Sequence, residues 1–74
     1  MPEIINLTYV QQQIGAGFTH AVVIERGAVE NSQAVSVHKN YESAAKALRT
    51  ARRATAVWSL QDVQKQLSPN HNQR

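Results

Sequence analysis

Hydrophobic residues recur along the chain at two different spacings, which predict where helices and strands form. Near the N-terminus, apolar residues recur every three or four positions, as they do in a helix buried on one side. We predict a helix within residues 2–14, ended by Gly15. Alternate residues of this segment are also apolar, so a strand over the same residues is the open alternative. The helical spacing is carried by Ile4, Leu7, Val10 and Ile14.

The middle of the chain has the pattern of a β-hairpin. Residues 18–26 and 34–39 are rich in β-branched residues, which favour strands. Residues 27–33 between them contain Gly, Asn and Ser, which favour turns. The two strands are therefore expected to pair in antiparallel fashion.

A register for this hairpin follows from its large branched side chains. Pairing Val22 with Val37 places both on the same face. In that register Ile24 lies opposite Val35, so one face of the hairpin becomes apolar and is expected to meet a helix.

Residues 41–54 contain neither Gly nor Pro and follow Asn40, a favourable N-cap, so we predict a helix over this whole range. Its apolar residues form a narrow stripe of mostly small side chains, which would let the helix lie close to the sheet. Its cations form a second stripe on the outer side. The apolar stripe consists of Tyr41, Ala44, Leu48 and Ala51, and the basic stripe of Lys46, Arg49 and Arg53, flanked by Arg52.

Residues 55–58 are rich in strand formers and predict a third strand. Ser59 and Asp62 then form a capping pattern for a last helix that would reach Leu67. In the alternative, which also stays open, helix 41–54 continues directly to Leu67.

These elements predict a single α+β domain over residues 1–67, in the order helix, strand, strand, helix, strand, helix. An antiparallel sheet of two or three strands would pack on the helix over residues 41–54. Residues 68–74 have no apolar side chain and predict a disordered tail. The small core and a free hairpin edge also allow a homodimer.

Composition limits the chemistry of this chain of 74 residues. With no cysteine, it can form neither a disulfide nor a thiolate metal site, and a reducing cytoplasm suits it. It has no apolar run long enough for a membrane span and no signal-peptide pattern at its start. We therefore expect a protein that acts in the cytoplasm and does not bind membranes.

The net charge of +3 is divided unevenly along the chain. Up to His38, one cation, Arg26, faces three carboxylates, for a net charge of −2. From Lys39 onward, seven cations face two carboxylates, for a net charge of +5. A concentrated positive field attracts acidic proteins or nucleic acid, so the basic half is the candidate binding site. Its residues are Lys39, Lys46, Arg49, Arg52 and Arg53.

Histidines are the main candidates for other chemistry. In the predicted register His20 lies opposite Lys39 and His38 points to the other face, so we expect no shared metal site. Ser36 and His38 alternate on one strand, but there is no nucleophile elbow and no candidate third member of a triad. The five carboxylates are scattered. We expect no catalytic activity, no metal and no cofactor.

Residues 36–53, a strand end followed by an alanine-rich basic helix, resemble the last strand and helix of double-stranded-RNA-binding domains. The rest of the chain departs from that family: the hairpin is short, a further strand and helix follow, and the basic cluster lies in the middle of the helix. In size and plan the chain also resembles the small cysteine-free α+β proteins with which bacteriophages inhibit host machinery, anti-CRISPR proteins among them. No particular residue carries this second resemblance.

The charge pattern predicts a binding protein that docks its basic helix on an acidic surface of a larger protein or nucleoprotein partner. The resemblance to phage proteins implies that such docking inhibits host machinery. The alternative is a nucleic-acid-binding regulator whose Lys and Arg side chains contact phosphates. The outer face of an amphipathic helix is also often merely solvated, and a pair between Glu42 and Lys46 would partly neutralise it.

Overall fold

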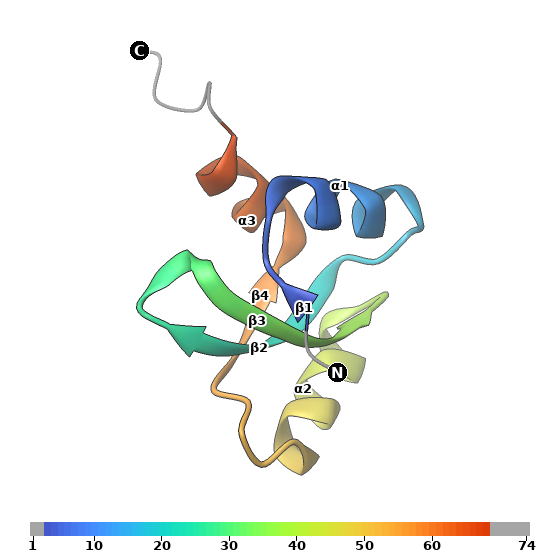
Figure 1. Ribbon diagram of the computed structural model, residues 1–74. Helices are drawn as coiled ribbons and strands as arrows, with labels where there is room; N and C mark the ends of the chain where they lie inside the picture. Colours follow the sequence, from blue (N-terminus) through green and yellow to red (C-terminus); the bar gives the residue numbers. More distant parts are fainter. Residues whose placement is uncertain (1–2, 69–74) are drawn as a thin grey trace.

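The computed structural model describes residues 3–68, which form three helices and one four-stranded antiparallel sheet (Figure 1). The predicted α+β class is confirmed, but the sheet has four strands instead of two or three. Residues 69–74 of the predicted tail lie outside the described residues. In chain order the elements are β1 (Glu3–Ile4), α1 (Leu7–Gly15), β2 (His20–Arg26), β3 (Ala28–His38), α2 (Tyr41–Thr50), β4 (Ala56–Ser59) and α3 (Leu60–Leu67).

The N-terminal segment contains both of the alternatives that its pattern allowed. Its first two described residues form β1, which pairs with β3 at the edge of the sheet. The helix begins only after Asn6, because the Asn6 side-chain oxygen accepts a hydrogen bond from the Tyr9 backbone N–H at 2.8 Å. Ile4 is consequently outside the helix and 58% exposed, whereas Val10 is fully buried.

Strand β2 is the centre of the molecule, because it pairs with β3 on one side and with β4 on the other. Its four consecutive residues from Ala21 to Ile24 are all buried. Since neighbouring side chains in a strand point to opposite faces, both faces of the sheet must be covered here. Helices α1 and α3 cover one face and α2 covers the other (Figure 1).

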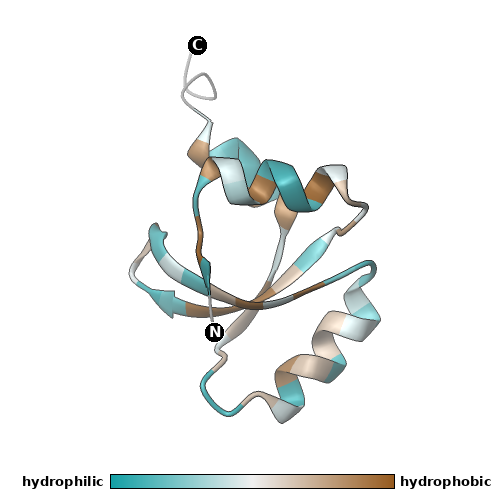
Figure 2. Cartoon of the chain, turned by 45° about the vertical axis from the view of Figure 1, so that its right-hand side comes forward, coloured by the Kyte–Doolittle hydropathy of each residue, from teal (hydrophilic) through white to brown (hydrophobic). Residues whose placement is uncertain are grey.

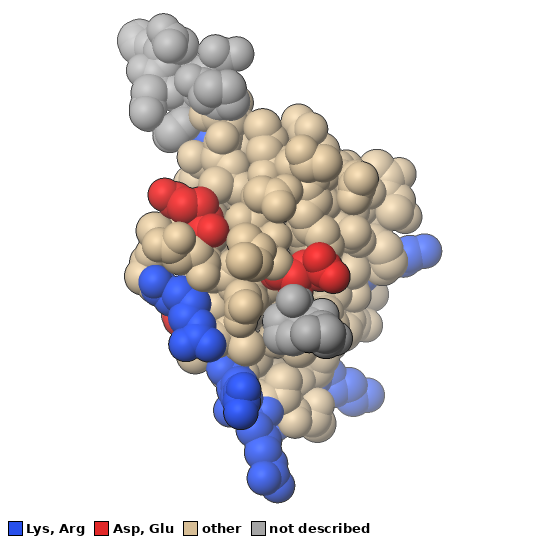
Figure 3. Space-filling view, in the orientation of Figure 1, with Lys and Arg blue, Asp and Glu red and all other residues tan. Residues whose placement is uncertain are grey.

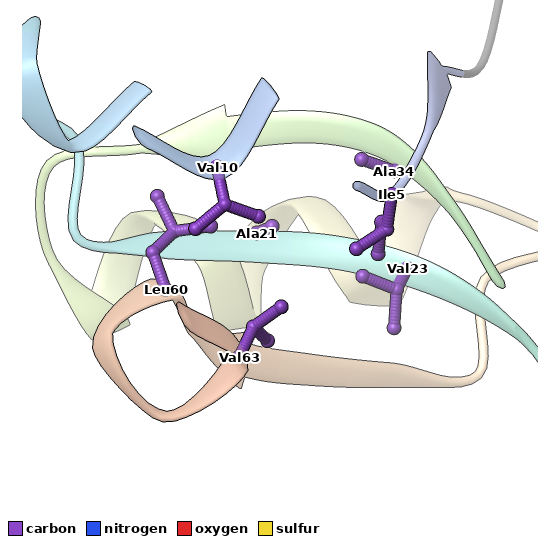
Figure 4. Close-up of a cluster of buried hydrophobic side chains, with 7 residues drawn as sticks. All are labelled: Ile5, Val10, Ala21, Val23, Ala34, Leu60 and Val63. Atoms are coloured by element: carbon purple, nitrogen blue, oxygen red, sulfur yellow. The ribbon is translucent and has the colours of Figure 1, made fainter. Parts of the chain in front are cut away.

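The larger of the two apolar layers lies between the sheet and the helix pair α1 and α3. Figure 4 shows side chains from α1, β2, β3 and α3, and from the segment that follows β1, meeting in this layer. Strongly hydrophobic residues are concentrated along the middle of the sheet and on the inner side of these helices, whereas α2 is paler (Figure 2). The buried cluster consists of Ile5, Val10, Ala21, Val23, Ala34, Leu60 and Val63.

The hairpin of β2 and β3 is confirmed as antiparallel, but the predicted register is wrong. Val22 lies opposite Ser36, and Val37 lies opposite Ala21. The prediction assumed that one face of the hairpin is apolar and the other polar. That assumption fails because the hairpin carries apolar residues on both faces, and an irregularity after Val22 shifts the pairing further along the strand.

The turn of the hairpin is tighter than the seven-residue connection that the sequence suggested. Strand β3 begins at Ala28, directly after Gly27, whose φ of +94° suits a glycine. The fully buried Ser32 holds this end together. Its hydroxyl accepts the Arg26 backbone N–H at 3.1 Å and donates to the Ala28 carbonyl at 3.0 Å.

The C-terminal part follows the first of its two predicted alternatives. The chain forms a strand, β4, and a separate helix, α3. The alternative of one continuous helix from residue 41 to Leu67 is therefore wrong. The Ser59 side chain makes no capping hydrogen bond, contrary to the predicted capping pattern. Instead, the Leu60 N–H donates to the Thr19 carbonyl at 2.8 Å, so a hydrogen bond from the neighbouring chain segment anchors the start of α3.

Replacing Ser32 with Ala should destabilise the fold by about 1–3 kcal/mol, because the Arg26 N–H and the Ala28 carbonyl would lose their partner in a buried place. Urea unfolding of the unaltered protein and of the Ser32→Ala variant would measure this loss. The slope of unfolding free energy against urea concentration should be the same for both. The exposed Ser43→Ala in α2 is the matched control and should change stability little. Equal effects of the two substitutions would contradict the role of Ser32.

The pKa of the Tyr9 hydroxyl is raised above 10.0, first because the phenol is partly buried and second because Glu3 is close. Since the unfolded chain loses this proton at lower pH, the contribution of Tyr9 to stability should decline as the pH rises above about 10. NMR titration of the Tyr9 ring would show the raised pKa. Glu3→Gln should reverse only the smaller part of the shift, and a Tyr9 pKa at or below 10.0 would refute this account.

Candidate functional site

The outer side of α2 carries the first part of the predicted binding site. The Asn40 side-chain oxygen caps this helix by accepting the Ser43 N–H at 2.8 Å, as predicted. The inner side is held by Ala44, which is fully buried because its small side chain lets α2 lie close to the sheet. Lys46 and Arg49 are therefore directed to the opposite, exposed side.

The predicted basic stripe along a helix that reaches residue 54 is wrong in its second half. Helix α2 ends at Thr50, and Arg52 and Arg53 lie in a turn that follows it. At this end the Ala47 carbonyl accepts both the Ala51 N–H and the Thr50 hydroxyl, each at 3.0 Å. In addition, the chain must reach β2 to form β4 within a few residues of Thr50.

Thr55 fixes the end of this turn to β2. Its backbone N–H donates to the Val23 carbonyl at 2.9 Å, and its hydroxyl oxygen accepts the Glu25 N–H at 3.0 Å. The same hydroxyl is 3.2 Å from the Glu25 carboxylate, to which it donates. The two arginines that precede Thr55 are thereby held beside the end of β2.

This arrangement adds Arg26, the last residue of β2, to the site. Charge counting along the sequence had assigned Arg26 to the acidic half of the chain. The last pair in the antiparallel register of β2 and β4 is Val23 with Ala56. If that register were extended by three residues, Arg26 would lie opposite Arg53. Figure 3 shows Lys and Arg side chains in a row along this flank, over the loop between α2 and β4. We call Arg26, Lys46, Arg49, Arg52 and Arg53 the basic surface; all five are exposed.

Lys39, the remaining predicted site residue, does not belong to this row. It precedes α2, at the opposite end of the helix from Arg52 and Arg53. Its ammonium group lies 5.8 Å from the centre of the Phe18 ring, within the range of a cation–π contact. Of the five predicted residues, the structure thus places Lys46 and Arg49 together on the exposed side of α2, Arg52 and Arg53 in the turn that follows it, and Lys39 before its start.

A shallow depression on the exposed side of α2 connects the cations to an aromatic side chain. Tyr41 lines it together with Lys46 and Arg49, and Glu42 and Ala45 are also part of its wall. We expected Tyr41 in the core, but it is 59% exposed, and its ring packs in a T-shaped arrangement on that of His20, with ring centres 5.7 Å apart. An aromatic ring and two cations are therefore presented on one surface.

The cations of the basic surface are not neutralised within the fold. Among residues 3–68, no Lys or Arg lies within 4.0 Å of a carboxylate oxygen. The pair between Glu42 and Lys46 that would partly neutralise the outer face of α2 is not formed. This surface is therefore available to an anionic partner.

His20 and His38 also differ from their expected placement, because the true register pairs them directly opposite each other. The Ser36 hydroxyl and His38 Nε2 are hydrogen-bonded at 2.8 Å, and the Thr19 hydroxyl and His20 Nδ1 at 2.8 Å. Within the described part of the chain, no carboxylate is bonded to either imidazole, so Ser36 and His38 have no third partner of the kind found in a catalytic triad.

Residues 3–68 lack two further features. They contain no cluster of three or more His, Cys, Asp or Glu side chains that could hold a metal ion. None of their helices is long and apolar enough to cross a membrane.

Comparison with known proteins identified no relative. No family model matches the chain, and neither the curated proteins nor the solved structures contain a significant match.

Replacing Thr55 with Val should loosen the turn that carries Arg52 and Arg53, because Val keeps the branched shape but cannot bond to Glu25. We expect a loss of about 0.5–1.5 kcal/mol in unfolding free energy, and faster hydrogen exchange at the Glu25 amide. Thr8→Val on the exposed side of α1 is the control. An unchanged exchange rate at Glu25 would show that Thr55 does not anchor the turn.

Proposed function

We propose that this protein is a small, non-enzymatic binding protein that docks through the basic surface on an acidic surface of a larger protein or nucleoprotein. The observation that carries this proposal is the set of exposed, unpaired cations on α2 and the following turn, next to the exposed ring of Tyr41. Arginine and tyrosine are the residue types that contribute most to protein interfaces.

The mixed chemistry of this surface favours a protein partner over bare phosphates. Glu42 lies in the same depression as Lys46 and Arg49, where its carboxylate would repel a phosphate backbone. Tyr41 and Ala45 add apolar area, which a protein partner can bury. The overall charge of +3 is also modest for a nucleic-acid-binding domain.

One observation favours nucleic acid as the second candidate. The arginines of the turn, Arg52 and Arg53, do not line the Tyr41 depression, and Thr55 ties the end of their turn to Glu25, the residue before Arg26. Three guanidinium groups at one edge could contact successive phosphates. In this case binding would depend on the turn more than on α2.

Inhibition is the expected consequence of docking, because a partner whose acidic surface is covered cannot use it for another ligand. We place this action in the cytoplasm, since a chain without cysteine suits a reducing compartment.

The decisive experiment is capture of the partner by the tagged protein from a nuclease-treated lysate of its own host, followed by binding measurements with the purified partner. The double variant K46E/R49E should weaken this binding at least about 100-fold, which is about 2.7 kcal/mol. Lys65→Glu, an exposed charge reversal on α3, is the matched control and should bind like the unaltered protein. The proposal fails if both variants bind equally, or if capture requires nucleic acid.

The nucleic-acid alternative has its own measurement. If the turn contacts phosphates, affinity for random duplex DNA or RNA should fall steeply between 50 and 200 mM salt. Replacing Arg52 and Arg53 with Ala should then reduce the slope of log K against log salt by about one per lost contact. Absence of binding at low salt would exclude this candidate.

A further inference from the structure

We propose that His20 and His38 form a site for one divalent transition-metal ion of borderline softness, with Zn²⁺ as the probe. This inference is independent of the proposed docking function, because it concerns the end of the sheet next to the start of α2. The two residues are paired directly across β2 and β3, and both are half-buried. Their side chains therefore project from the same face of the sheet.

The backbone geometry suits two ligands of one ion. The Cβ atoms of directly opposed residues in an antiparallel pair are about 4.5–5.5 Å apart. Zinc binds imidazole nitrogen at about 2.0–2.1 Å, so the two ligating nitrogens must approach each other to within about 3–3.5 Å. Opposed imidazoles on adjacent strands are close enough for both to reach one ion, although the two rings do not contact each other in this structure.

Each imidazole already has a hydrogen bond of the kind that orients a metal ligand. The Thr19 hydroxyl holds His20 Nδ1, and the Ser36 hydroxyl holds His38 Nε2, both at 2.8 Å. The other nitrogens, His20 Nε2 and His38 Nδ1, have no hydrogen bond to the described residues. If the hydroxyl accepts the ring N–H, the opposite nitrogen keeps its lone pair for a metal.

The surroundings restrict the rings and the charge near them. The Tyr41 ring contacts that of His20 edge-on, at an interplanar angle of 72°, and limits its rotation. Lys39 follows His38 in the chain, but its ammonium group lies over the Phe18 ring. The proposed site offers two protein ligands, because no third His, Cys, Asp or Glu of the described residues joins His20 and His38. Water would therefore complete the coordination shell. Imidazole ligands favour Zn²⁺, Ni²⁺ and Cu²⁺ over Mg²⁺ and Ca²⁺.

Calorimetric titration of the untagged protein with Zn²⁺, together with amide NMR spectra, tests this site. We expect one ion per chain, shifts concentrated around residues 19–22 and 36–41, and no binding of Mg²⁺. His20→Ala and His38→Ala should each weaken Zn²⁺ binding at least about tenfold, as the loss of even an outer-shell partner commonly does.

His71→Ala removes the remaining imidazole of the chain and should leave the affinity unchanged. His20→Gln and His38→Gln keep a polar side chain of similar size and replace the alanine variants if these unfold. The proposal is overturned if the unaltered protein does not bind Zn²⁺, or if binding persists in the His20 and His38 variants and is lost with His71.

Discussion

The burial of β2 on both of its faces is the constraint on which the rest of the structure depends. Four consecutive apolar residues, Ala21 to Ile24, cannot all face one layer, because alternate side chains of a strand point to opposite sides. Two layers of helix are therefore needed, and a chain this short supplies them with α1 and α3 on one face and α2 on the other.

The position of α2 determines which cations become available. Because Ala44 lies against the sheet, the residues on the opposite side of the helix can only face solvent. The chain must then return from the end of α2 to pair β4 with β2. This return ends the helix early and holds the turn, through Thr55, beside Arg26. The basic surface thus includes residues from two separate places in the sequence, Arg26 and the segment 46–53.

The predictions from sequence mostly succeeded where local chemistry decides, apart from the capping bond expected of Ser59, and failed where the two faces of the sheet matter. The cap at Asn40 and the presence of the last strand and helix were confirmed, because they depend on short patterns. The register failed, since pairing Val22 with Val37 assumed a sheet with one polar face. The run of buried residues in β2 was itself the signal of a doubly covered strand. The same error in register concealed the opposed pair of His20 and His38.

For the candidate site, the sequence by itself determined which half of the chain is basic and that Lys46 and Arg49 share the outer side of one helix, because both follow from the order of residues and the period of a helix. Only the tertiary structure decided that Arg26 joins them and that Lys39 does not. Those placements depend on strand pairing and on where the chain turns, and both are set by contacts between residues far apart in the sequence.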